Sequence, residues 1–89
     1  MQLTQAHLDI LSEITADGFD PSQWTFANDQ AVDDKKALIE EINVALPSVG
    51  CMIGCYPAYL DCVKSNPSYP GRAICDTYLS QCIAGCSQQ

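Results

Sequence analysis

The stretch of sequence that decides the fold spans residues 51–86 and reads CMIGCYPAYLDCVKSNPSYPGRAICDTYLSQCIAGC. It contains all six cysteines of the chain, which are Cys51, Cys55, Cys62, Cys75, Cys82 and Cys86. Their spacing, C-x3-C-x6-C-x12-C-x6-C-x3-C, is the same in both directions. Because each residue of an α-helix turns by about 100°, the first three cysteines share one narrow helical stripe, and the last three share another in reverse order. The pattern predicts two antiparallel helices whose cysteine stripes face each other.

Facing stripes favour a nested ladder of disulfides. The mirrored spacing pairs the outermost, middle and innermost cysteines, giving Cys51–Cys86, Cys55–Cys82 and Cys62–Cys75. Six cysteines allow 15 pairings, and the sequence alone does not choose among them. We favour the ladder because its pairs come into register together on an antiparallel hairpin.

Two glycines and a proline bear on this hairpin. A disulfide needs the two Cβ atoms about 4 Å apart, and Gly54 and Gly85 are expected to permit that approach. Pro57 removes a hydrogen bond if it lies inside a helix. Either the helix kinks at Pro57, or residues 51–55 form a separate turn, which would disturb the outer pairing more than the innermost pair.

The other predicted helices follow from apolar spacing and from proline and glycine signals. Apolar side chains recur at helical intervals in residues 3–16 and 30–46, and the hairpin helices are expected at about 56–64 and 70–85. A short helical turn is expected at 21–26, where proline follows an N-capping aspartate. The sequence therefore predicts an all-α fold, a small bundle of about four helices with a disulfide-laced antiparallel C-terminal hairpin.

Aromatic side chains are expected to fill the interior of this bundle. Phe19, Trp24 and Phe26 surround the predicted short turn and are expected to complete the core of the first segment. Tyr59 and Tyr78 are expected to pack on the hairpin.

Charge is distributed unevenly along the 89 residues. The net charge is −7, and residues 1–50 carry all of it, with nine Asp and Glu against two Lys. The sequence thus predicts an acidic helical segment, 1–50, and a neutral cysteine-rich hairpin, 51–89, which together form one compact unit. This balance argues against nucleic acid as a partner, because phosphate binding needs clustered Lys and Arg. No apolar run is long enough to span a bilayer.

The change of composition at residues 47–50 also favours a second interpretation. Small residues, Ser48, Val49 and Gly50, come directly before Cys51. In this alternative, residues 1–50 are a leader or pro-segment and the cysteine-rich part is the active peptide. The first twenty residues lack the basic start and continuous apolar stretch of a secretory signal.

The number of cysteines favours structural disulfides and an extracytoplasmic location, secreted or otherwise, because short chains with many cysteines usually form bridges in oxidising compartments. The alternative is a thiol protein that binds Cu(I) or senses redox state. A zinc site is disfavoured because His7 is the sole histidine and no C-x2-C pair occurs. We expect no cofactor.

The sequence shows no catalytic signature, and we expect a non-enzymatic protein. His7 falls on the apolar face of the first predicted helix, where it is expected to be a core or boundary residue. The acidic pairs Asp33-Asp34 and Glu40-Glu41 are expected to lie on solvated helix faces. Nucleophilic catalysis needs a nucleophile beside an oriented base, and no local pattern supplies one.

The candidate binding surface surrounds the predicted loop 65–70, which combines aromatic and proline residues. Tyrosine contributes a large contact area at little entropic cost. The candidate contact residues are Tyr56, Pro67, Tyr69 and Arg72. The expected target is a protein or a cell surface, and the expected role is that of an effector, an inhibitor or a toxin-like factor.

Residues 51–86 resemble the α-hairpinins and the twin-cysteine helical hairpins of the mitochondrial intermembrane space, in which C-x3-C elements face each other across a helical hairpin. Cys62 and Cys75 add a rung that two-bridge hairpinins lack. The resemblance implies hairpin geometry. Because such groups include antimicrobial, toxin-like and inhibitor peptides, it also implies a binding role.

Overall fold

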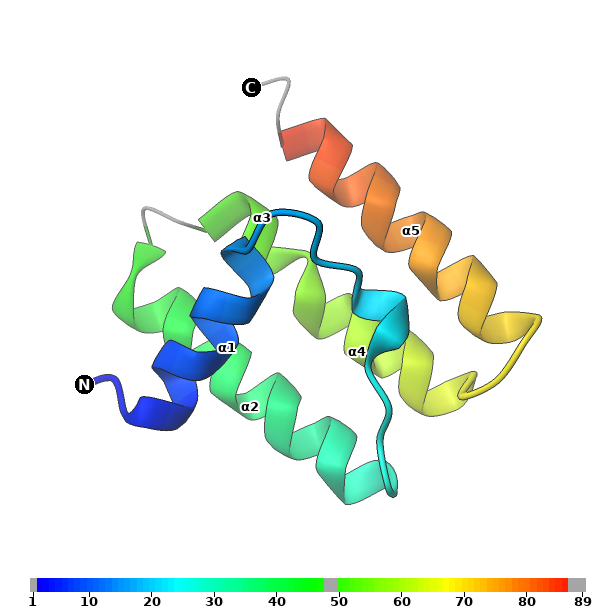
Figure 1. Cartoon of the computed structure of the whole chain (residues 1–89), viewed down its shortest axis with the longest axis horizontal. Coiled ribbons are helices and arrows are strands. Elements are labelled where there is room, and N and C mark those ends of the chain that lie inside the picture. Colours follow the sequence, from blue (N-terminus) through cyan, green and yellow to red (C-terminus); the bar gives the residue numbers. More distant parts are fainter. Residues whose placement is uncertain (1, 48–49, 87–89) are drawn as a thin grey trace.

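The computed structural model describes residues 2–47 and 50–86, in which helices are joined by turns and loops and no strand occurs (Figure 1). The elements are α1 (Gln5–Thr15), the 3-10 turn η1 (Pro21–Gln23), α2 (Asp29–Ala45), α3 (Gly50–Gly54), α4 (Tyr56–Ser65) and α5 (Gly71–Cys86). Figure 1 shows α4 and α5 side by side and antiparallel, with α2 along the other side of α4. The predicted all-α fold with a C-terminal hairpin is confirmed.

Capping residues fix where the first helices begin and end. Thr4 has extended backbone angles and caps α1, so this helix begins at Gln5 instead of residue 3 as predicted. Beyond its other end, Gly18 adopts a φ of 75°, the left-handed conformation that glycine tolerates best. Asp20 caps η1 through a hydrogen bond from the backbone N–H of Ser22, and Asn28 caps α2. These short polar signals hold the linker between α1 and α2 in a defined path.

The break at Pro57 takes the form of a separate turn, α3, followed by α4. Pro57 lies in the first turn of α4, where a missing N–H costs no helical hydrogen bond. The expectation that a separate turn would disturb the outer bridges is wrong. Cys55, between the two helices, keeps right-handed helical angles (φ −73°, ψ −24°), and its C=O still accepts a hydrogen bond from Tyr59 N–H. The cysteine stripe therefore continues across the break.

The three disulfides have the pairing that the mirrored spacing favours. Cys51–Cys86, Cys55–Cys82 and Cys62–Cys75 have Cα–Cα distances of 5.7, 6.0 and 5.7 Å, within the usual range for disulfides. They tie α5 to α3 and α4 along its whole length.

The prediction that Gly54 and Gly85 permit this approach is wrong. A Cβ atom placed on either glycine would meet no neighbouring segment within 4 Å. Both glycines lie beside the cysteine stripe and not on it, so the helix separation does not depend on them.

One core joins the two halves of the sequence. The buried residues are His7, Ile10, Ile14, Trp24, Val32, Ile39 and Ile42 from the first half, with Ile53, Cys55, Tyr56, Tyr59, Leu60, Val63, Cys75 and Leu79 from the second. Trp24 is buried as predicted, while Phe19 and Phe26 are partly buried against the same cluster. The change of charge near residue 50 is therefore not a break in packing. Ser48 and Val49, on which the cleavage alternative partly depends, lie outside the described residues.

We predict that the Cys62→Ala, Cys75→Ala double variant loses about 2–4 kcal/mol of unfolding free energy, because the Cys62–Cys75 bridge no longer restricts the unfolded chain. The bridged residues are 13 positions apart. Denaturant unfolding of both oxidised proteins measures the difference, and intact mass checks that the other two bridges form. An unchanged denaturation midpoint would contradict this prediction, because it would show that Cys51–Cys86 and Cys55–Cys82 alone restrict the unfolded chain.

Candidate binding surfaces

The structure separates the four predicted contact residues. Tyr56 is only 1% exposed, so its expected role as a surface contact residue is corrected: its ring belongs to the core. Pro67 and Arg72 line a hollow of about 360 Å³ together with Trp24. Tyr69 lies on another surface and is 85% exposed. The loop after α4 therefore contributes to two surfaces instead of one.

Arg72 links the hairpin to the linker around η1. Its Nη2 donates hydrogen bonds to the backbone oxygens of Pro21 and Trp24 at 3.1 and 3.0 Å. Its Nε donates to the Tyr59 hydroxyl at 3.3 Å, and that hydroxyl donates to Asp76 Oδ1 at 2.6 Å. The Arg72 side chain is only 16% exposed. These contacts place Arg72 mainly inside the structure, where it joins the two halves of the chain.

We predict that Arg72→Ala lowers the unfolding free energy by about 2–3 kcal/mol, because it removes the charged donor that binds the backbone oxygens of Pro21 and Trp24. The matched control is Lys64→Ala, which removes an exposed ion pair to Asp33 at 2.9 Å and is expected to cost less than about 1 kcal/mol. Thermal and denaturant unfolding compare the two variants. Equal losses would contradict the linking role of Arg72.

Burial raises the pKa of Tyr56 and Tyr59 from 10 to about 12. For Tyr59 the hydrogen bond to Asp76 acts in the same direction, while Arg72 opposes it. The raised values follow from the loss of phenolate solvation inside the core.

We predict that the folded state loses stability as pH rises from about 10 to 12, because in this range the unfolded chain releases phenol protons that the folded chain retains. Unfolding free energy measured by denaturant titration across this range is expected to fall with pH. Tyr56→Phe removes one of the two phenols and is expected to make the decline shallower. A decline as steep as that of the parent protein would contradict this assignment.

The outward side of α5 exposes large apolar side chains. Ile74 and Tyr78 are 69% and 50% exposed and lie beside Tyr69. Tyr78 was expected to pack on the hairpin, and the structure corrects this. We define the outer face of α5 as Tyr69, Ala73, Ile74, Thr77, Tyr78 and Gln81, which line a shallow hollow of about 530 Å³.

The sequence alone only partly indicates the outer face. Ile74 and Tyr78 are one helical turn apart on a flank of α5, about 100° and 60° around the helix from Cys75. The cysteines fix the inward side, but this flank borders it, and it is the packing of the folded chain that leaves Ile74 and Tyr78 exposed.

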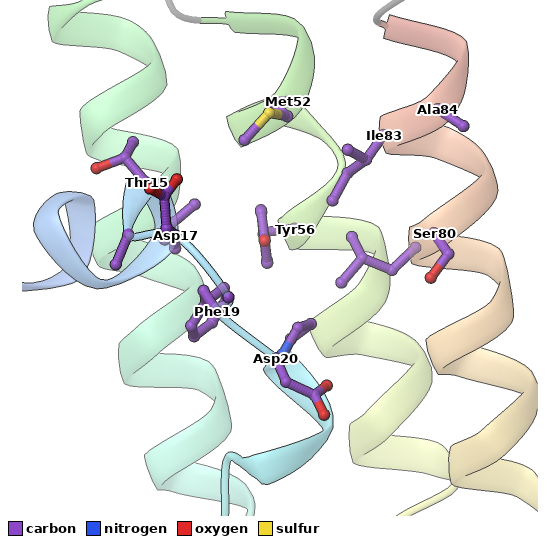
Figure 2. Close-up of a pocket in the computed structure, with 14 residues that line it drawn as sticks. Thr15, Asp17, Phe19, Asp20, Met52, Tyr56, Ser80, Ile83 and Ala84 are labelled. Carbon is purple, nitrogen blue, oxygen red and sulfur yellow. The ribbon is translucent and has the colours of Figure 1, made fainter.

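A second hollow, of about 610 Å³, lies between the linker that follows α1 and the helices α3 and α5 (Figure 2). We call it the linker groove. Its apolar lining comes from Ile14, Phe19, Met52, Tyr56, Leu79 and Ile83. In Figure 2 the Ile83 side chain points from α5 toward Tyr56. Its polar lining includes Asp17 and Asp20 from the linker and Ser80 from α5. Sequence patterning gave no indication of this groove, because the path of the linker creates it.

The four Lys and Arg side chains all have partners within the chain. Lys36 pairs with Asp61 at 2.9 Å, and Lys64 and Arg72 have the contacts given above. Lys35 Nζ lies 4.1 Å from the centroid of the Trp24 ring, and burial lowers the pKa of this ammonium group, with Glu13 acting in the opposite direction. Binding surfaces on this protein therefore derive their charge mainly from carboxylates.

The acidic pairs of α2 are only partly solvated helix faces. Asp33 binds Lys64, and Glu41 Oε1 accepts a hydrogen bond from His7 Nε2 at 2.9 Å, while Asp34 and Glu40 are exposed. His7 Nδ1 lies 2.9 Å from the backbone N–H of Thr4, which donates to it. Because one imidazole nitrogen then accepts, the other is free to donate to Glu41. His7 thus completes the cap of α1 and ties this helix to α2.

The oxidised chain holds no thiolate for a metal, because all six cysteines are bridged. Within residues 2–47 and 50–86, no cluster of three or more His, Cys, Asp or Glu could hold a metal ion. In the same residues, no helix is both long and apolar enough to cross a membrane.

Comparisons with protein-family models, with curated proteins and with solved structures find no match to this chain.

Proposed function

We propose that this chain is a small non-enzymatic protein that works outside the cytoplasm, as a secreted or otherwise extracytoplasmic effector or inhibitor, by binding another protein through the outer face of α5. The observation that carries the proposal is the exposure of Ile74 and Tyr78 of α5 beside Tyr69, which precedes this helix and lines the same hollow. Exposed aromatic and aliphatic side chains grouped in this way are typical of interaction sites.

The charge distribution supports a partner with an uncharged apolar surface. The residues that define the outer face of α5 carry no charge, although the chain as a whole has a net charge of −7. A charged partner surface would be desolvated against this face without gaining an ion pair. Apolar contact with hydrogen bonds from Tyr, Thr and Gln fits the composition of such interfaces.

Rigidity supports the same role. Three bridges hold α5 against α3 and α4, so its outward side chains start from a fixed backbone. A preorganised surface loses less conformational entropy on binding than a flexible one. Three disulfides also favour folding and action in an oxidising environment.

The contacts of Arg72 support the full chain as the active form. They join α5 to the backbone of Pro21 and Trp24, and the shared core includes side chains from both halves. Removal of residues 1–50 after cleavage would expose the side chains of this core that belong to the hairpin. The precursor interpretation is therefore less well supported than action of the intact protein.

The test places a photo-crosslinking phenylalanine analogue at position 78 of the oxidised full-length chain, in the fluid and at the cell surfaces of its native source. We expect one crosslinked partner that disappears when Tyr69→Ser and Ile74→Ser are added, since truncated anchor residues typically weaken binding by about tenfold or more.

The matched control uses Val44, an exposed apolar residue of α2. The analogue at position 44 is expected to yield no such partner, and Val44→Ser is expected to leave the crosslink from position 78 intact. The same product from both positions, or its persistence in the double variant, would overturn the proposal. A crosslink between two copies of this chain would overturn it in favour of self-association.

A further inference from the structure

The linker groove combines an apolar floor with open edges. Met52 is 37% exposed, and Ser80 lies on the solvent side of α5. The volume of about 610 Å³ is within the range of ligand-binding sites. Because both edges are exposed, an extended segment of another chain can lie across the floor without opening the fold.

The edge formed by the linker is negatively charged. Among the described residues that line the groove, Asp17 and Asp20 carry the only charges. Hydrogen bonds from the side chain and backbone of Ser22 lower the pKa of Asp20, so this carboxyl is ionised near neutral pH. The Lys and Arg side chains are engaged elsewhere. The two carboxylates therefore attract a cationic group of a partner, and no Lys or Arg side chain of the groove competes for them.

Asp17 has no hydrogen bond or ion pair within the part of the chain that the structure describes. The adjacent left-handed turn at Gly18 places it beside the apolar lining. In Figure 2, Asp17 and Asp20 lie along the linker, while Ser80 and Ile83 come from α5 on the other side. Negative charge is thus confined to one edge of the groove.

We propose that the linker groove binds a cationic amphipathic segment of a partner protein. One or two large apolar side chains of this segment pack on Phe19, Met52 and Ile83, and a flanking Lys or Arg pairs with Asp17 and Asp20. The apolar floor supplies contact area, and the one-sided charge sets the orientation of the segment. The net charge of −7 attracts such a segment before contact.

This site is independent of the outer face of α5. The groove uses Leu79, Ser80 and Ile83, whereas the outer face uses Ile74, Tyr78 and their neighbours. Absence of binding at one surface therefore does not bear on binding at the other.

The test uses the oxidised full-length protein and a short fluorescein-labelled peptide of alternating Leu and Lys. Matched peptides replace every Lys by Glu, or every Leu by Ser. We expect fluorescence anisotropy to show saturable binding of the Leu-Lys peptide alone, weakened by added salt. Chemical-shift changes in nuclear magnetic resonance spectra are expected to concentrate at Phe19, Met52 and Ile83.

Variants of the groove and matched variants elsewhere decide the assignment. Asp17→Asn is expected to weaken binding by about two- to fivefold, the range for an exposed ion pair. Met52→Ser is expected to weaken it by about fivefold through lost apolar contact. The controls are Asp34→Asn, the same charge change on α2, and Leu8→Ser, an exposed apolar residue of α1.

Four results would overturn the proposal. They are an absence of saturable binding by the Leu-Lys peptide, an equal effect of Asp34→Asn and Asp17→Asn, binding that survives replacement of Leu by Ser in the peptide, and shift changes centred away from the groove. Circular dichroism and intact mass confirm that each variant is folded and fully bridged, so a loss of binding reports on the groove itself.

Discussion

The ladder of three disulfides is the constraint on which the other surfaces of this protein depend. It fixes the separation and the rotation of α5 relative to α3 and α4, with Cα–Cα distances of 5.7 to 6.0 Å at three levels. Rotation matters as much as separation, because it determines that Cys75 and Leu79 face inward and that Ile74 and Tyr78 face solvent. A helix held only by apolar contacts could rotate to bury those two side chains, but a bridged one cannot.

The contacts of Arg72 extend this constraint to the first half of the chain. The guanidinium group binds two backbone oxygens near η1, and through them the linker is held against the hairpin. The linker forms one wall of the groove, so the shape of the groove depends on a hydrogen-bonded residue that does not line it. Asp20 and Asn28 also hold the path of the linker, because they cap η1 and α2.

The helices and the bridge pairing could be predicted because they follow from local periodicity. The cysteine spacing determines which residues of the two hairpin helices face each other. The caps at Asp20 and Asn28 each depend on a single polar side chain. The effect of Pro57 was harder to anticipate, because it depends on Cys55 keeping helical angles between two helices. The position of Tyr56 was misjudged since nearness to a loop in sequence says little about depth in the core. The groove could not be predicted because its walls come from segments more than 30 positions apart, brought together by tertiary packing.

The internal pairing of every Lys and Arg has a colloidal consequence. With its positive charges held in internal contacts, the molecule presents a mainly anionic exterior, and its net charge of −7 makes copies repel one another in solution. Such repulsion keeps proteins soluble even when they display apolar side chains. The acidic first half of the chain thus allows the second half to keep Tyr69, Ile74 and Tyr78 uncovered without aggregating.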